Sequence, residues 1–349
     1  MLDSHIGNKI PKVSVCVPSY NHARYIGQCI ESVLGQTLDD WELVIVDNSS
    51  SDNTDDVVRG YRDPRIRFFK NESNIGAARN WKRCASLARG GYVAFLQSDD
   101  FYLPQMLERS AGMLDAHPTV GFTHSGFHRI DEEGNHIGTK QQWQANRVMP
   151  GLAALRTLAV DNYITPSTVM MRQSSFHDAG GIDESYQYEL DWSMWMRLAL
   201  RGDVAYIAEP LVTQRSGHSG SLTVSRVLRR PRLVTSEDLR LIEEIFRKLP
   251  VTEEWCDLRR ESYRRLMDRH IHRTLWLLHQ GEAAAFRSEI MYAIRRDHEF
   301  PFRYRKIMAL WVASLAGANL AKWLDFREQI FWQAFQNKPG EREPMLIVP

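Results

Sequence analysis

The stretch Gly91-Tyr92-Val93-Ala94-Phe95-Leu96-Gln97-Ser98-Asp99-Asp100 joins an apolar run to two adjacent carboxylates. The run Tyr92–Leu96 predicts a buried strand, and Asp99 and Asp100 follow where it ends. Open α/β sheets bind ligands at the carboxyl ends of their strands. A divalent cation at such an edge takes oxygen ligands from carboxylates and from substrate phosphates. The alternative is that both side chains solvate a loop and cap the helix that begins at Pro104.

Three further strands are predicted before this stretch, at residues 13–17, 41–46 and 65–70, with helices between them. This alternation of strand and helix predicts a right-handed, largely parallel α/β sheet. Turns rich in Asn, Asp and Ser follow three of the four strands. Because the carboxyl ends of neighbouring parallel strands meet at one edge, these turns predict a nucleotide-type site there.

The rest of the chain divides into two regions of different pattern. We expect helices at residues 104–117, 151–160 and 189–199, strands at 120–130, 167–171 and 204–214, and a loop at 135–150. From about residue 225 the pattern becomes that of Arg-rich helices, at 236–249, 254–279 and 282–296, and then a more apolar helix at 304–335. The predicted organisation is therefore an α/β domain at 1–223, a helical region at 224–336 and a poorly ordered tail at 337–349.

The charge of the chain is unevenly spread. The net charge is +1 over 349 residues, but residues 1–223 carry −5 and residues 224–306 carry +6. We expect no nucleic-acid partner for the acidic part, whereas the basic part favours an anionic partner or a membrane surface. The four cysteines lack metal-ligand spacing and favour buried thiols in a reducing compartment. With no apolar leader and no run of about 18 apolar residues, we expect a cytoplasmic protein.

Five short motifs resemble, in this order, those of the family 2 glycosyltransferases, which have the GT-A fold. They are VCVPSYN at 15–21, IVDNSSSDNT at 45–54, NIGAARN at 74–80, LQSDD at 96–100 and LDW at 190–192. The resemblance covers roughly residues 11–223 and implies a GT-A-like nucleotide-binding sheet with flanking helices; the α-helical C-terminal extension lies outside it. The implied reaction moves a sugar, with inversion, from a nucleotide diphosphate donor, a UDP-sugar being favoured, to a hydroxyl of a glycan or lipid-linked acceptor.

The resemblance also implies which residues bind the donor. They are Pro18, Ser19, Tyr20, Asp47, Asn74, Arg79, Gln97, Ser98 and Asp99. Asp47 matches an acidic residue that contacts the nucleoside base, and Arg79 would lie near the base or the diphosphate. The alternative for Asn74 and Arg79 is a helix cap and a solvated surface charge.

A divalent cation, Mn²⁺ or Mg²⁺, is the implied cofactor, because it would offset the charge that develops on the leaving diphosphate. Asp99 matches the metal-binding carboxylate of the family, with Asp100 beside it. His218 resembles a histidine that completes the metal site in some relatives, although a lone loop histidine is more often solvated. Gln97 stands where the family often has an aspartate, so one acidic group is missing, but its amide could still hydrogen-bond a ribose hydroxyl.

Asp191 matches the carboxylate that acts as the catalytic base of the family. A base needs a pKa shifted toward neutrality, and apolar neighbours such as Leu190, Trp192 and Trp195 could shift it by desolvation. Leu190 stands where the family usually has an acidic residue. The alternative is that Asp191 caps a helix at 192–200.

Four aromatic residues are candidates for stacking on acceptor sugar rings: Trp143, Tyr188, Trp192 and Trp195. Core packing is the alternative reading, and it is favoured for Trp192 and Trp195. In the C-terminal region, a basic pair precedes an apolar stretch within residues 304–317, a pattern that suits an interfacial helix on an anionic membrane. Packing on the catalytic domain and homodimer formation are the alternatives.

Two other functions compete with glycosyl transfer. A sugar nucleotidyltransferase would need a Gly-rich, basic loop after the first strand, and Pro18–Asn21 is not such a loop. A degenerate nucleotide-sugar-binding module would keep the fold without transfer. Gln97 and Leu190 favour that module slightly, whereas intact Asp99 and Asp191 argue against it.

Overall fold

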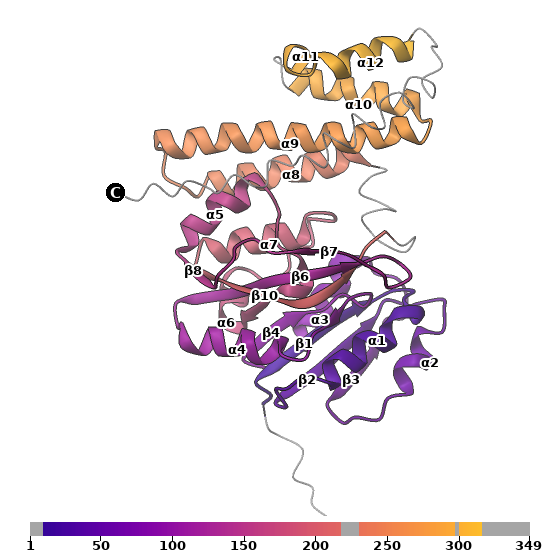
Figure 1. The fold of residues 1–349 in the computed structure, drawn as a ribbon, viewed down its shortest axis with the longest axis vertical. Helices are drawn as coiled ribbons and strands as arrows, with labels where there is room; N and C mark the ends of the chain where they lie inside the picture. Colours follow the sequence, from indigo (N-terminus) through magenta and orange to yellow (C-terminus); the bar gives the residue numbers. More distant parts are fainter. Residues whose placement is uncertain (1–9, 218–229, 297–299, 316–349) are drawn as a thin grey trace, which may run out of the picture. The chain divides into compact units, whose positions relative to one another are not determined.

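The computed structural model describes residues 10–217, 230–296 and 300–315 (Figure 1). These residues form two compact units. The first comprises the described residues up to 217 together with 233–266, and the second comprises 230–232 and the described residues from 267 onward. The predicted domain boundary at residues 223 and 224, the tail at 337–349 and His218 lie outside the described residues.

The first unit is built on a sheet in the order β3-β2-β1-β4-β9-β6-β10-β5. Its first four members are β1 (Val13–Ser19), β2 (Trp41–Asp47), β3 (Ile66–Lys70) and β4 (Tyr92–Phe95). They pair in parallel, as predicted, with β1 between β2 and β4. Both β1 and β2 are buried along their whole length, which explains their nearly continuous apolar sequences.

The rest of the sheet is mixed rather than parallel. Its strands are β5 (Phe101–Tyr102), β6 (Val120–Ile130), β9 (Met170–Arg172) and β10 (Asp203–Arg215). Strand β9 pairs antiparallel with both β4 and β6, whereas β6 and β10 are parallel. The predicted loop at 135–150 was wrong: it contains β7 (His136–Lys140) and β8 (Arg147–Met149). These short edge strands are largely exposed, so they lack the apolar alternation by which a strand is recognised.

Helices cover both sides of this sheet (Figure 1). They are α1 (Ala23–Leu34), α2 (Thr54–Arg59), α3 (Ala77–Ser86), α4 (Met106–Ala116), α5 (Gly151–Val160), α6 (Gln173–Asp178) and α7 (Leu190–Ala199), with a 3₁₀ turn, η1, at Pro166–Thr168. In α1 the residues Ile26, Cys29 and Ile30 recur at helical spacing and are fully buried in the core against the sheet. The helical stripes of the sequence thus pack the sheet and leave its carboxyl edge to the turns.

The first unit also contains α8 (Pro231–Phe246, from residue 233) and the first part of α9 (Glu253–His279). The second unit contains the rest of α9 with α10 (Ala283–Arg296), α11 (Phe300–Arg303) and α12 (Arg305–Leu315), around a core that includes Phe286 and Ile290. Within the described parts of the chain, none of the helices has the length and apolarity needed to span a membrane. Membrane-surface binding and dimerisation stay predictions, and the predicted helix at 304–335 is described only to Leu315.

Candidate active site

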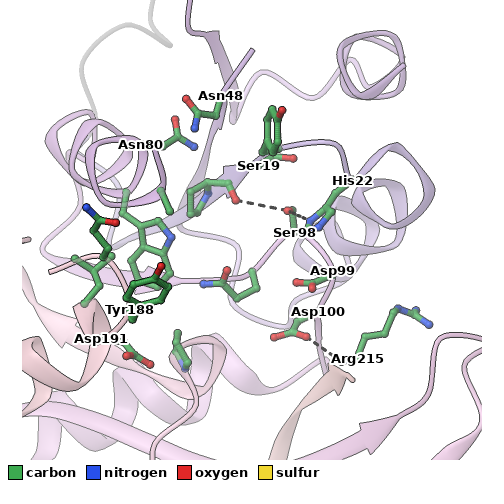
Figure 2. A pocket seen from close by; sticks show the side chains of 18 of the residues that line it. Ser19, His22, Asn48, Asn80, Ser98, Asp99, Asp100, Tyr188, Asp191 and Arg215 are labelled. Atoms are coloured by element: carbon green, nitrogen blue, oxygen red, sulfur yellow. Dashed lines mark hydrogen bonds between the residues drawn. The ribbon is translucent and has the colours of Figure 1, made fainter. Parts of the chain in front are cut away.

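A cavity of about 300 Å³ opens at the carboxyl ends of β1 and β4 (Figure 2). Its lining comes from turns far apart in the sequence: Pro18, Ser19, Tyr20, His22, Asn48, Asn74, Ala77, Asn80, Trp81, Gln97, Ser98, Asp99, Asp100, Pro166, Gln187, Tyr188, Leu190, Asp191, Gln214 and Arg215. Nine predicted site residues are among them, and two, Asp47 and Arg79, are not. Figure 2 shows Asp99 and Asp100 on one side of this cavity and Tyr188 and Asp191 on another.

The turn after β4 places its side chains in different environments. Ser98 is buried, and its hydroxyl lies 2.7 Å from Nδ1 of His22 at the start of α1. Asp99 is partly exposed on the cavity, whereas Asp100 is buried. The two adjacent carboxylates therefore differ in their access to a ligand.

Asp100 uses both carboxylate oxygens to hold other parts of the chain. The Ser167 hydroxyl donates to Oδ2 at 2.5 Å, and the backbone N–H of Arg215 donates to Oδ1 at 2.9 Å. Burial, and then the neighbouring charge of Asp99, raise the pKa of Asp100 well above its usual range. Asp100 thus ties η1 and the end of β10 to the turn that carries Asp99.

The residues around Asp99 fit a cation that is shared with a bound ligand. Among the residues that the structure describes, no group of three or more His, Cys, Asp or Glu side chains could hold a metal ion. Mg²⁺, however, is commonly bound by one or two carboxylates together with substrate phosphates and waters. A partly exposed Asp99 on the cavity suits that mode of binding better than a site made by the protein alone.

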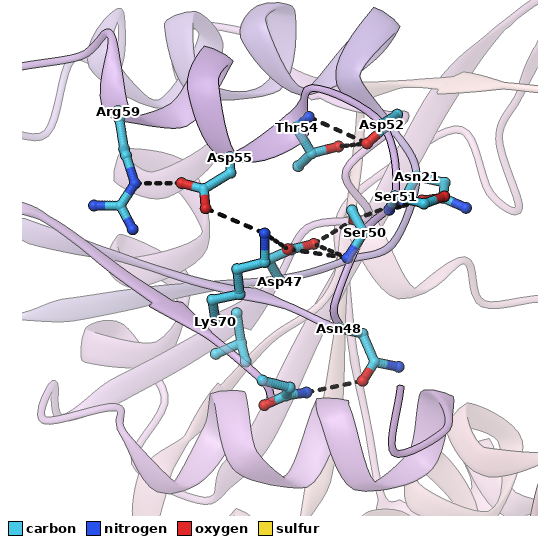
Figure 3. A network of polar contacts seen from close by, with 12 residues as sticks. Asn21, Asp47, Asn48, Ser50, Ser51, Asp52, Thr54, Asp55, Arg59 and Lys70 are labelled. Carbon is cyan, nitrogen blue, oxygen red and sulfur yellow. Dashed lines mark hydrogen bonds and ion pairs between the residues drawn. The ribbon is translucent and has the colours of Figure 1, made fainter. Parts of the chain in front are cut away.

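Asp47 lies at the end of β2 but is fully buried beneath its own turn (Figure 3). Its carboxylate accepts a hydrogen bond from the backbone N–H of Ser50 at 3.1 Å and another from the Ser50 hydroxyl. Lys70 Nζ lies 3.9 Å from its Oδ2. The next residue, Asn48, lines the cavity instead, and its amide donates to Oδ1 of Asn74 at 3.0 Å. Asn48 and Asn74, rather than Asp47, therefore line the cavity beside the turn after β2.

Arg79 lies on the exposed side of α3. Its Nε is 3.2 Å from a carboxylate oxygen of Glu184, and its side chain is 68% exposed. The helix is preceded by Gly76, whose N–H donates to Oδ1 of Asn74. Asn74 therefore organises the turn before α3 while lining the cavity, and Arg79 points to the surface ion pair.

Asp191 is partly buried in the first turn of α7, on the cavity. Its Oδ1 accepts hydrogen bonds from the backbone N–H of Trp192 at 2.7 Å and from the Asn162 amide at 3.4 Å. Loss of solvation outweighs these bonds and raises the pKa of Asp191 to about 6. The alternative reading, that Asp191 caps a helix at 192–200, was wrong, because α7 begins at Leu190 and Glu189 occupies the cap position.

The aromatic candidates separate clearly. Trp192 and Trp195 are almost completely buried, which confirms the core reading. Trp192 also donates from Nε1 to the carbonyl of Leu158 at 2.8 Å. Tyr188 lines the cavity, whereas Trp143 is not among its lining residues and packs with Tyr206.

Several lining residues could not be recognised from the sequence: His22, Asn48, Asn80, Gln187, Gln214 and Arg215. His22, Asn48 and Asn80 lie within or beside the recognised motifs, but their residue types alone gave no role. Arg215 gave no signal, because its place depends on strand pairing that brings it to Asp100. In the described part of the chain, Ser19 Oγ and Gln97 Nε2 are buried without a hydrogen-bond partner, and both residues line the cavity, where a ligand could supply one.

Comparison with known proteins identifies the family of this chain. The family model described as "Glycosyl transferase family 2" matches residues 14–180. A relative from Mycobacterium tuberculosis, the uncharacterized protein MT1568, is 30% identical over 233 residues, covering 62% of this chain and 70% of that protein. The chain belongs to glycosyl transferase family 2.

This family 2 member is also similar to a longer synthase in sequence, and it shares its fold with a solved structure. The chondroitin synthase of Escherichia coli is 28% identical over 209 residues, which are 59% of this chain but only 29% of the synthase. The crystal structure of S. aureus TarS residues 1–349 in complex with UDP-GlcNAc superposes with a TM-score of 0.64 at 19% identity, covering 88% of this chain and 92% of that one. The predicted fold class, a GT-A-like sheet with flanking helices and a helical C-terminal extension, is confirmed.

Proposed function

We propose that this family 2 member is an inverting glycosyltransferase. It would move a sugar from a nucleotide diphosphate donor, a UDP-sugar being favoured, to a hydroxyl of a glycan or glycolipid acceptor, in surface polysaccharide biosynthesis. The observation that carries the proposal is that two carboxylates, Asp99 on the β4 turn and Asp191 on α7, line one cavity of about 300 Å³. The TarS complexes with UDP-GlcNAc and with UDP support a nucleotide-sugar donor.

Asp191 is the proposed general base. With a pKa of about 6 it is mostly ionised at neutral pH, yet basic enough to accept a proton from an acceptor hydroxyl as that oxygen attacks the anomeric carbon. The bond from the anomeric carbon to the donor phosphate oxygen breaks as the new glycosidic bond forms on the opposite face. The hydrogen bonds from Trp192 and Asn162 hold the carboxylate in place for this transfer.

Asp99 is the proposed protein ligand for Mn²⁺ or Mg²⁺, held jointly with the donor diphosphate. When bound, such a cation would offset the negative charge that develops on the leaving nucleotide. Asp100 is proposed to help indirectly, since both of its oxygens already hold the surrounding chain.

The donor itself would lie along the turns after β1, β2 and β4. The unpartnered Ser19 Oγ and Gln97 Nε2 can hydrogen-bond its polar groups, with Asn48 and Asn74 beside them. Tyr20, which is 42% exposed at the cavity, offers a ring for the base.

The experiment is a thermal-shift screen of uridine, guanosine and thymidine diphosphate sugars with and without Mn²⁺, followed by transfer assays with the best donor. We expect stabilisation by a UDP-sugar that increases with Mn²⁺, and turnover that is lost in Asp191→Asn. Stabilisation without transfer or donor hydrolysis would refute the enzyme and favour a nucleotide-sugar-binding module. The absence of stabilisation by every nucleotide would refute both.

A further inference from the structure

One carboxylate of α8 holds three consecutive backbone amides of the segment that enters α7. Glu237 accepts hydrogen bonds from the N–H groups of Gln187 at 3.0 Å, Tyr188 at 2.8 Å and Glu189 at 3.2 Å. The carboxylate and these amides are about 50 residues apart in the sequence but belong to the same compact unit. Charge-assisted hydrogen bonds of this kind are stronger than those between neutral groups.

The same face of α8 also holds the two residues that come just before these amides. Arg240 donates to the carbonyl of Ser185 at 2.8 Å, and its guanidinium lies 4.0 Å from the centre of the Tyr186 ring. Tyr186 is fully buried, and its hydroxyl donates to Glu244 at 2.9 Å. Positions three, four and seven apart share a helix face. Glu237, Arg240 and Glu244 therefore lie on one side of α8, and together they contact every residue from 185 to 189.

Residues 185–189 lead directly into the cavity. Gln187 and Tyr188 line the cavity themselves, and Asp191 follows within the first turn of α7. The cap residue of α7, Glu189, makes no side-chain capping hydrogen bond. Its backbone N–H donates instead to Glu237 on another helix, and Glu237 lies outside the residues that match the family model.

We propose that Glu237 is a positioning residue, through which α8 sets the place of Tyr188 and Asp191 in the cavity. The inference rests on the proposed function, because it assigns α8 a part in the same reaction. It gives the helical region a role in turnover that does not require it to touch either substrate. A displacement of a reacting group by about 1 Å can lower a rate about 100-fold. Greater freedom of residues 187–189 would displace Asp191, so it is expected to reduce turnover strongly.

The test compares Glu237→Ala and Glu237→Gln with the matched control Glu243→Gln. Glu243 is also on α8, but its carboxylate accepts from Arg259 at 2.7 Å and from Tyr263, both on α9. Two readouts are measured for each purified full-length variant: hydrogen exchange of a peptide covering residues 185–191, and kcat and KM for sugar transfer. Thermal unfolding and circular dichroism establish that each variant is folded.

Glu237→Ala is expected to speed exchange in this peptide and to lower kcat by about 10- to 100-fold, with the donor KM changed less than about threefold. Glu237→Gln should fall between Ala and wild type, because its amide oxygen still accepts hydrogen bonds. Glu243→Gln should leave exchange in the peptide and kcat unchanged even if it lowers the unfolding midpoint.

Two results would overturn the inference. Unchanged exchange in Glu237→Ala would show that the carboxylate does not hold the segment in solution. Faster exchange with wild-type kcat would show that the contact is structural and does not position Asp191. Failure of the proposed function is distinguishable from both, because the wild-type protein would then transfer no sugar while the exchange measurement still reported on the contact.

Discussion

Replacing Asp191 by asparagine is expected to stabilise the folded protein while it abolishes turnover. Loss of solvation raises the pKa of this carboxyl from its ordinary value of 3.8 to about 6, so the ionised form is disfavoured in the folded state. Each pKa unit corresponds to about 1.4 kcal/mol, and the penalty at pH 8 is therefore about 3 kcal/mol. Asparagine carries no charge and can still accept the N–H of Trp192, so it should escape this penalty.

The stability gained by Asp191→Asn should be largest at high pH and should fall as the pH is lowered. Above about pH 7 the carboxyl is ionised in both the folded and the unfolded state, and the penalty is complete. Below pH 3.8 it is protonated in both states, and the penalty disappears. Between these limits the folded state binds more protons, so the advantage of Asp191→Asn should fall to about half of its pH 8 value at pH 5.

The assay is equilibrium urea unfolding of wild type and variant at pH 8 and pH 5, followed by tryptophan fluorescence. Asp63→Asn is the matched control of opposite sign, because a hydrogen bond from Arg65 lowers the pKa of Asp63. That variant should lose stability at pH 8. Burial would not be the cause of the raised pKa if Asp191→Asn were no more stable than wild type at pH 8, or if its gain were the same at both pH values.

The same substitution gives a kinetic result. Wild-type kcat/KM should fall about tenfold per pH unit well below pH 6, as the base becomes protonated, and reach a plateau above pH 7. Loss of a general base lowers turnover by about 10² to 10⁴, so Asp191→Asn should be almost inactive at saturating donor. Wild-type turnover in this variant would mean that another group acts as the base.

Two further predictions concern the metal and the packing. Asp99→Asn should abolish the gain in UDP affinity that Mn²⁺ provides, measured by calorimetry, whereas Asp115→Asn on the surface of α4 should retain it; a retained gain in Asp99→Asn would contradict the metal assignment. Gly151→Ala should destabilise by about 3 kcal/mol or more in thermal unfolding, since its Cβ would lie 2.1 Å from the Ala199 carbonyl oxygen. Gly112→Ala, with nothing within 4 Å, should stabilise α4 by about 0.5–1 kcal/mol, and equal effects of the two substitutions would refute the packing argument.

The sequence predicted strands most reliably where they are buried, because a buried strand needs an apolar sequence. The strands at 13–17 and 41–46 are buried on both faces, so their apolar runs could be recognised, and the polar turns after them had to meet at one edge. The exposed strands at 136–140 and 147–149 were missed for the converse reason, since an exposed edge strand needs no apolar alternation.

The sequence alone could not assign distinct roles to equivalent carboxylates. Asp99 and Asp100 are adjacent and identical in type, and only the fold brings Ser167 and Arg215 to Asp100 while leaving Asp99 on the cavity. In the same way, the turn at Ser50 encloses Asp47. A carboxylate's availability depends on what covers it, and those groups come from other parts of the chain.

By itself, then, the sequence determined the family resemblance, the parallel strands at the front of the sheet and the edge at which their polar turns gather. These follow from local patterns of burial and turn chemistry, which neighbouring residues encode. Tertiary structure alone decided that Asp191 is buried enough to have a pKa of about 6, and that Glu237 holds the segment before it. Solvation and long-range hydrogen bonds depend on residues that only folding brings together.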